Sequence, residues 1–201
     1  MRYIVILILI FSICQTTWAQ SEEENSLKVS LQTDLLAYTT AGGWSAWASA
    51  QYDRYKLSLA YVNYPNRFRS IYEETGIQEN PRWLRIQLSR QFKPSSKLRN
   101  FFYGINLEYQ WRELVEDNNP DEVLNDSHGQ LGLFVGYEWA PWRENEHALR
   151  NLSFIFWGGL NALPTNNEMS RVFENTASVY DIPGIFRSTI GINVSYIIFQ
   201  H

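Results

Sequence analysis

Strict alternation of apolar and polar residues dominates the chain from residue 27 onward. The clearest case is residues 101–112. The alternate positions on one face are all apolar or aromatic: Phe101, Tyr103, Ile105, Leu107, Tyr109 and Trp111. The opposite face is mostly polar or small: Phe102, Gly104, Asn106, Glu108, Gln110 and Arg112. A helix would spread both sets around its circumference, whereas a strand separates them completely. The pattern therefore predicts a β-strand.

The same period of two recurs in seven further segments. They are residues 27–32, 45–52, 55–61, 84–89, 130–139, 151–156 and 189–198. Each segment has roughly the length that a tilted strand needs to cross a bilayer, and membrane barrels have an even number of strands. We therefore predict an all-β fold: a single eight-stranded antiparallel up-and-down transmembrane β-barrel over residues 27–201.

The predicted connections fall into two groups that alternate along the chain. Short ones lie at 53–54, 93–97 and 141–148, and long ones at 65–81, 113–127 and 161–185, with 39–43 as the short member of the second group. Membrane barrels have short periplasmic turns at one end and longer extracellular loops at the other. The sorting of the connections therefore favours a membrane barrel.

Alternation alone does not say which face points outward. In a soluble lipocalin-like carrier the apolar face points inward, whereas in a membrane barrel it meets lipid. Large aromatic residues gather near segment ends, as interfacial girdles require: Trp44, Tyr52, Tyr55, Tyr61, Trp83, Tyr109, Trp111, Tyr137, Trp139 and Trp142. The many small residues on the polar face also suit a crowded lumen. We favour the membrane barrel and keep the secreted carrier as an alternative.

The N-terminus has the three parts of a secretory signal peptide. Arg2 gives a basic start, an apolar run extends from Tyr3 to Cys14, and small residues Thr17 and Ala19 precede a cleavage site after Ala19. The apolar run is shorter than the ~20 residues of a membrane-spanning helix. We predict a signal peptide over 1–19, a flexible segment over 20–26, and export.

Composition narrows the possible partners. The 201 residues carry a formal charge of −4, with 17 basic and 21 acidic residues, and 15% are aromatic. The acidic balance and the absence of a Lys/Arg cluster argue against nucleic acid as a partner. The single cysteine excludes a disulfide framework and a cysteine-based zinc site, and we predict no cofactor.

These features together resemble the small Gram-negative outer-membrane β-barrels of the OmpA-domain or OmpX type. The signal peptide, the eight amphipathic strands, the loop lengths and the final Tyr196-Ile197-Ile198-Phe199 segment carry the resemblance. Such barrels often end on a lipid-facing phenylalanine, but Phe199 precedes two more residues and falls out of phase with the alternating apolar set. We expect a monomer of the cell outer membrane, in contact with lipid and lipopolysaccharide, with an envelope-structural or surface-recognition role.

Charged residues on the polar face would have to be paired inside so small a barrel. That face carries Lys28, Asp34, Lys56, Arg85, Glu108, Arg112, Glu138 and Arg187. We predict a luminal charge network of Arg85, Glu108, Arg112 and Glu138. Because eight strands enclose roughly enough room for side chains alone, the network is expected to fill the lumen. A gated proton or ion path is the alternative.

The 113–127 connection is acidic and contains no Lys or Arg. Glu116, Asp117, Asp121 and Glu122 could bind a divalent cation weakly or attract a basic protein partner, or could simply be solvated. The resemblance to an EF-hand loop stops at Glu122, which stands where the glycine is required, and at His128, which stands where the final acid is required.

We predict no catalytic and no metal-ligating residue. A barrel enzyme that modifies outer-membrane lipid is the alternative, and it would need a polar cluster at the rim, such as His128 with Ser127 and Glu138. None of the three histidines has a second histidine at metal-ligand spacing.

Overall fold

The computed structural model describes residues 26–64, 68–69, 77–93, 97–98, 100–116, 119–144, 148–162, 170–172, 179–181 and 186–201. The predicted signal peptide, residues 1–19, lies outside the described residues, as does all of the 20–26 segment except Ser26. No helix among the described residues is long and apolar enough to cross a membrane.

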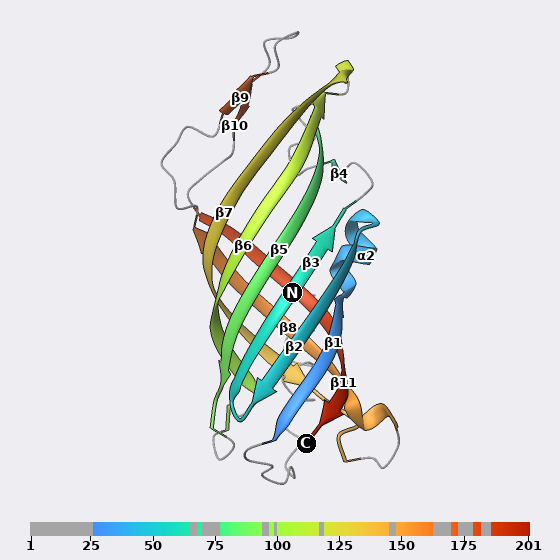
Figure 1. Ribbon diagram of the computed structural model, residues 1–201, viewed down its shortest axis with the longest axis vertical. Coiled ribbons are helices and arrows are strands. Elements are labelled where there is room, and N and C mark those ends of the chain that lie inside the picture. The colour runs from blue at the N-terminus through green and yellow to red at the C-terminus, as the bar shows by residue number, and fades with distance from the viewer. Residues whose placement is uncertain are drawn as a thin grey trace, which may run out of the picture.

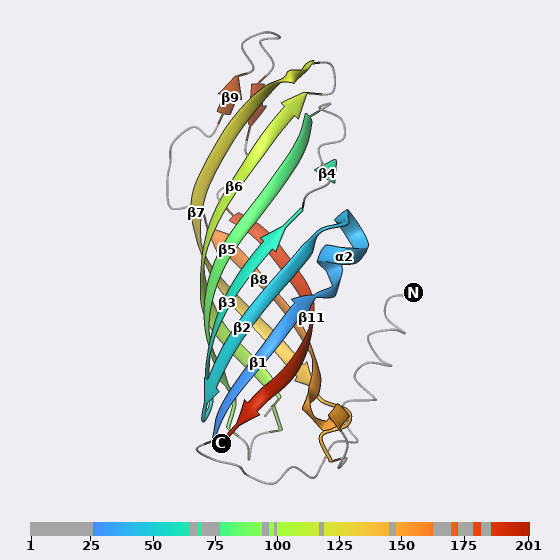
Figure 2. The ribbon, with the colours of Figure 1, turned by 45° about the vertical axis from the view of Figure 1, so that its right-hand side comes forward.

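Eight long strands form a closed antiparallel barrel, shown in Figures 1 and 2. They are β1 (Leu27–Asp34), β2 (Trp44–Tyr52), β3 (Tyr55–Asn63), β5 (Ile77–Gln91), β6 (Phe101–Glu116), β7 (Asn119–Trp139), β8 (Leu152–Ala162) and β11 (Phe186–Gln200). Each strand pairs with its neighbours in the sequence order of these eight, and β1 pairs with β11 to close the cylinder. The predicted eight-stranded up-and-down barrel is confirmed.

The barrel has two distinct ends. At the turn end lie the β2–β3, β5–β6 and β7–β8 connections, together with Leu27 and the C-terminus. The β2–β3 hairpin there turns in two residues, and Asp53 has a left-handed φ of 49°, as a tight hairpin requires. The loop end carries the other connections. Its first connection contains the short helix α2 (Leu35–Ala41), which the sequence analysis did not predict; Asp34 caps it by accepting a hydrogen bond from the Leu36 amide at 2.9 Å.

The β1–β11 pairing that closes the barrel contains a β-bulge, which brings Phe199 onto the same face as the outward apolar residues. Val29 pairs with Phe199, whereas Ser30 pairs with Ile197, so Ile198 is the extra residue. Opposed residues share a face, and Phe199 therefore points outward with Val29. The start of β1 is joined to the last residue by backbone hydrogen bonds in both directions between Leu27 and His201, each 3.0 Å long.

Strands β5, β6 and β7 extend well beyond the other strands at the loop end (Figures 1 and 2). The prediction of a loop over 113–127 is wrong here, because β6 continues to Glu116 and β7 begins at Asn119. The register pairs Glu113 with Asn125 and Val115 with Val123. Both faces of a solvated sheet can be polar, so strand pairing can continue past the point where the apolar–polar alternation ends.

Short elements complete the loop end. They are β4 (Phe68–Arg69), which pairs with β5, and the hairpin of β9 (Ser170–Val172) and β10 (Val179–Asp181). A short 3-10 helix, η3 (Ala148–Asn151), precedes β8 at the turn end.

Candidate functional site

The outer surface of the barrel is apolar around its middle. Its most exposed large side chains include Leu31, Leu57, Ile105, Leu107, Leu131, Leu133, Val135, Leu160 and Ile190. The side chains buried on the inner face include many polar groups, among them Ser49, Ser58, Asn106, Gln130, Asn161, Asn193 and Ser195. This distribution is that of a membrane-spanning barrel. The lipocalin-like alternative, with the apolar face turned inward, is wrong.

Aromatic rings border the apolar band on both sides. On the loop side Tyr61 lies 5.4 Å from Trp44 and 6.1 Å from Trp111, between ring centroids. On the turn side the rings include Tyr52, Tyr55, Phe101, Tyr103, Tyr137, Trp139 and Phe154. Eight positions separate Tyr103 from Trp111 on β6. At ~3.4 Å per residue and a tilt of ~40° they span roughly 20 Å of height, close to the apolar band of membrane barrels.

An aromatic plug fills the middle of the lumen. It consists of Trp47, Phe102, Phe134 and Trp157, packed with Ala60 and Ile155. Trp157 lies 6.3 Å from both Trp47 and Phe134, and Phe102 lies 6.0 Å from Phe134. The expectation of a lumen filled by polar side chains therefore needs correction: large rings occupy its centre.

Glycines on neighbouring strands make room for these rings. Gly136 is paired with both Phe102 and Trp157, and Gly191 is paired with Trp157 from the other side. A Cβ at Gly191 would lie 2.3 Å from the Trp157 indole nitrogen, which is far too close. Three of the four plug rings thus lie opposite a glycine, whereas Trp47 lies opposite Gln32 and Ala60.

Arg85 and Glu108 form a buried ion pair against the plug. Arg85 Nε donates to Glu108 Oε2 at 2.6 Å, and Arg85 Nη2 contacts the same oxygen. The guanidinium lies 4.8 Å from the Trp157 ring centroid and 5.9 Å from that of Trp47. Cation–π contacts of this kind add to the charge pairing. The pair and the plug together obstruct the middle of the barrel.

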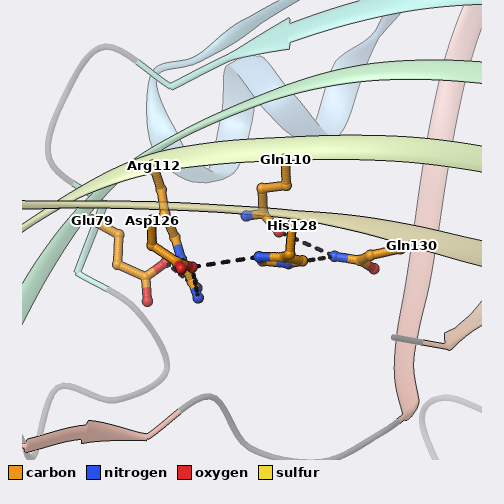
Figure 3. A network of polar contacts seen from close by, with 6 residues as sticks. All are labelled: Glu79, Gln110, Arg112, Asp126, His128 and Gln130. Atoms are coloured by element: carbon orange, nitrogen blue, oxygen red, sulfur yellow. Dashed lines mark hydrogen bonds and ion pairs between the residues drawn. The ribbon is translucent and has the colours of Figure 1, made fainter. Parts of the chain in front are cut away.

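A second polar group, the loop-end cluster, lies on the inner face nearer the loop end. Figure 3 shows its side chains. The cluster comprises Glu79, Gln110, Arg112, Asp126, His128 and Gln130. Arg112 donates to Asp126 Oδ2 from Nε at 2.9 Å and from Nη2 at 2.7 Å, and its Nη1 reaches Glu79 Oε2 at 3.5 Å. His128 Nδ1 lies 3.4 Å from Asp126 Oδ2. Two carboxylates thus contact a single guanidinium, and the imidazole lies beside one of them.

Hydrogen bonds define the protonation pattern of this cluster. The Gln130 amide nitrogen lies 3.0 Å from His128 Nε2 and donates to Gln110 Oε1 at 3.1 Å. Because an amide nitrogen only donates, His128 Nε2 accepts and Nδ1 carries the proton toward Asp126. Burial raises the pKa of Asp126, but hydrogen bonds from His128 and Arg112 and the Arg112 charge outweigh it. The net result is a pKa well below the usual range of an aspartate.

A third charged group lies at the turn end. Gln91 Nε2 donates to Glu138 Oε2 at 3.4 Å, and Arg143 Nη2 reaches Glu138 Oε1 at 3.4 Å. Lys56 and Glu138 also border a cavity of about 20 Å³ beside the plug. A cavity of that size holds about one water molecule.

The four residues of the predicted charge network therefore divide among three places. Arg85 and Glu108 pair with each other, Arg112 pairs with Asp126 and Glu79, and Glu138 lies at the turn end. Sequence reasoning placed Glu79 and Asp126 in loops and so missed them as partners of Arg112. Counting alternate positions back from Gln130 along β7 would have placed Asp126 inside, opposite Arg112.

The predicted acidic site is also dispersed. Glu116 is buried at the end of β6, Asp121 is exposed near the start of β7, and Glu122 is half-buried. Asp117 lies outside the described residues. Within the part of the chain that the structure describes, no group of three His, Cys, Asp or Glu side chains could hold a metal ion.

The rim cluster proposed for a lipid-modifying enzyme does not form. His128 is buried inside the barrel, whereas the neighbouring Ser127 is exposed on the outer face. Glu138 lies beside Arg143 at the opposite end. A nucleophile and its base must lie within hydrogen-bond reach, and these three side chains do not.

No protein-family model matches the chain, and no curated protein sequence is significantly similar to it. Among solved structures, the chain is similar to Neisserial surface protein A (NspA), with a TM-score of 0.47 and 12% sequence identity over 87% of this chain and 95% of that one.

Proposed function

We propose that this chain is a closed, non-enzymatic β-barrel of the Gram-negative outer membrane that supports the envelope and presents its tall strands at the cell surface. The observation that carries the proposal is the apolar, ring-bordered exterior around an interior that holds buried polar groups, among them the Arg85–Glu108 pair. Water favours the reverse arrangement, whereas hydrocarbon requires this one.

The filled lumen supports a structural role in preference to a channel. Trp47, Trp157 and the Arg85 guanidinium lie together in the middle of the barrel. An eight-stranded barrel has an interior just wide enough for side chains, and here those side chains are large. In planar bilayers the purified protein is expected to give no stable conductance steps. Regular ohmic steps would contradict the closed-barrel proposal.

The orientation that fits best has the turn end in the periplasm. The described turn-end connections carry exposed Lys93 and Lys97, whereas the tall strands carry exposed Asp121 and half-buried Glu122. Acidic tips at the surface could attract a basic protein partner. Cysteines at Asp121 and Arg54, labelled in whole cells with an impermeant thiol reagent, test the orientation. Labelling at Arg54 but not at Asp121 would reverse it.

Two measurements test the membrane location itself. Unextracted protein should sediment with the outer membrane, and unheated samples should migrate differently from boiled ones on a denaturing gel. Recovery of the protein as a soluble species without detergent would refute the proposal. Mass spectrometry of lipid A from expressing cells separates it from the enzyme alternative, since a modified lipid would require catalysis.

A further inference from the structure

A depression lies on the outer face of β5, β6 and β7, just beyond the apolar band. It has a volume of about 300 Å³. From the outer face it is lined by Asn80, Arg82, Tyr109, Trp111, Glu113, Asn125 and Ser127, and the intervening Arg112 and Asp126 complete the lining. The strand register aligns these residues in two rows. Arg82, Trp111 and Ser127 form the lower row, and Asn80, Glu113 and Asn125 form the upper row. Apart from Arg112 and Asp126, whose side chains are buried in the loop-end cluster, its lining residues take no part in the luminal clusters described above.

The rows immediately below lead into the lipid-facing surface. Leu84, Tyr109 and Gly129 are aligned next, followed by Ile86, Leu107 and Leu131. Leu107 and Leu131 are 57% and 56% exposed. Gly129 leaves a gap beside the Tyr109 ring, since a Cβ there would have no neighbour nearer than 3.9 Å. An apolar chain can therefore run from this gap down the strip of leucines.

The polar rows offer charge and neutral donors at the level of lipid headgroups. Arg82 Nη2 lies 3.3 Å from Glu113 Oε1, yet the Arg82 side chain remains 41% exposed. Asn80 Nδ2 donates to Glu113 Oε2 at 3.4 Å, which holds the carboxylate on the side away from Ser127. Guanidinium groups bind phosphate oxygens through two parallel hydrogen bonds, and amides and hydroxyls supply further donors. The Trp111 ring belongs to the interfacial row.

We infer that this depression binds the phosphorylated headgroup of a lipid in the surrounding leaflet. The phosphate contacts Arg82, with Asn125 and Ser127 as neutral donors, and the acyl chains lie along Leu84, Leu107 and Leu131. Glu113 competes for the same guanidinium and so weakens the site. The inference rests on the proposed membrane location and adds to it a specific lipid contact.

Native mass spectrometry of the purified full-length barrel in mild detergent, titrated with bisphosphorylated lipid A, tests the inference. Arg82→Gln removes the cation, and the expected result is roughly tenfold weaker binding, the size of one lost charge-assisted hydrogen bond. Glu113→Gln frees Arg82 and is expected to strengthen binding. Arg90→Gln is the matched control, because Arg90 lies on the same strand near the turn-end ring of Tyr55.

Several outcomes would overturn the inference. The first is that Arg82→Gln binds lipid A as tightly as the unchanged protein. The second is that Arg90→Gln loses as much affinity as Arg82→Gln. The third is that dephosphorylated lipid A binds as tightly as the bisphosphorylated form. Displacement of lipid A by millimolar inorganic phosphate would show a free-anion site instead. The unheated gel shift of each variant, measured first, separates the two proposals: a barrel that is folded in the outer membrane but does not discriminate these lipids refutes only the lipid site.

Discussion

Strands β5 and β6 carry two Arg–Glu pairs, one on each face of the same ladder. On the inner face Arg85 and Glu108 are directly opposed and hydrogen-bonded, with side chains only 9% and 3% exposed. On the outer face Arg82 and Glu113 are diagonal neighbours at 3.3 Å, with side chains 41% and 39% exposed. The chemical groups are the same, and only their surroundings differ.

The comparison shows how one hairpin can separate stability from recognition. A buried charge that loses its partner stays in a medium that cannot solvate it, so the inner pair is a requirement of the fold. An exposed pair exchanges its partner for water at little cost, so the outer pair is available to a ligand. Substitutions in and around the two pairs test that difference.

Glu108→Leu should be the most damaging change in this group. It leaves the Arg85 guanidinium buried without its carboxylate, and the expected loss of unfolding free energy is about 3–5 kcal/mol. Urea titration of the barrel in lipid vesicles measures it. The double change Arg85→Met with Glu108→Leu should recover most of the loss, because Trp47 and Trp157 already make the surroundings apolar. A neutral Glu108→Leu would mean that the inner face is solvated.

Leu107→Arg tests the adjacent outward position on β6. The side chain is 57% exposed in the middle of the apolar band, so a charge there should cost about 2–4 kcal/mol in a bilayer. The control is Asn106→Ser, one residue earlier and inside the barrel. The Asn106 amide atoms have no hydrogen-bond partner among the described residues, and the change should cost less than about 1 kcal/mol. If Leu107→Arg is tolerated as well as this control, the outer face does not meet hydrocarbon.

Gly191→Val tests whether the plug on the inner face is tightly packed. The new side chain would collide with the Trp157 indole, and overpacking of this kind costs about 1–3 kcal/mol. Gly158→Val is the matched control on β8, because its nearest neighbours stand at an ordinary 3.7 Å. The same unfolding titration compares the two variants. Equal stability of both would show that the plug is loosely packed.

The sequence predicts the barrel well because the apolar band imposes alternation on every strand. Leu107 and Leu131 point outward as the alternation requires. The prediction fails where that constraint ends. Residues Glu113 and Asn125 are polar on the outer face, so the tall strands look like a loop although their pairing continues. The bulge at Ile198, which turns Phe199 outward, leaves no signal in the alternation itself.

The charged partners were only partly predictable for a related reason. Arg85 and Glu108 lie directly opposite each other within the alternating segments, so neighbouring strands and a shared face suffice to suggest their pairing. The Arg112 partners Asp126 and Glu79 required knowledge of how far β5 and β7 extend. Phe102 and Phe134 occupy alternate positions on the polar face, and the glycines paired with them, Gly136 and Gly104, were the overlooked signal for a plug.

Asp126, which pairs with Arg112 in the loop-end cluster, supplies a prediction about pH. Its pKa is lowered in the folded protein relative to an unfolded value of about 3.9, so its ionised form stabilises the fold above that value. This stability is lost as the pH falls below about 4 toward the folded pKa, by up to about 1.4 kcal/mol per pH unit. Unfolding midpoints between pH 7 and pH 2 should therefore fall more steeply for the unchanged protein than for Asp126→Asn. Parallel curves would show that the Arg112 contact does not perturb this carboxyl.

The smallest effect is expected at the outer Arg–Glu pair, and it bears most directly on the comparison. Arg82→Gln, Glu113→Gln and the double change form a thermodynamic cycle whose coupling energy should be about 0.2–1 kcal/mol, because both side chains are well exposed. Added salt should reduce that coupling further, since exposed charges are screened at high ionic strength. The matching cycle on Arg85 and Glu108 should give a larger and salt-insensitive coupling, because that pair is shielded from solvent by the plug. If the outer pair couples as strongly as the inner one, Arg82 is committed to Glu113 and is not available to a lipid phosphate.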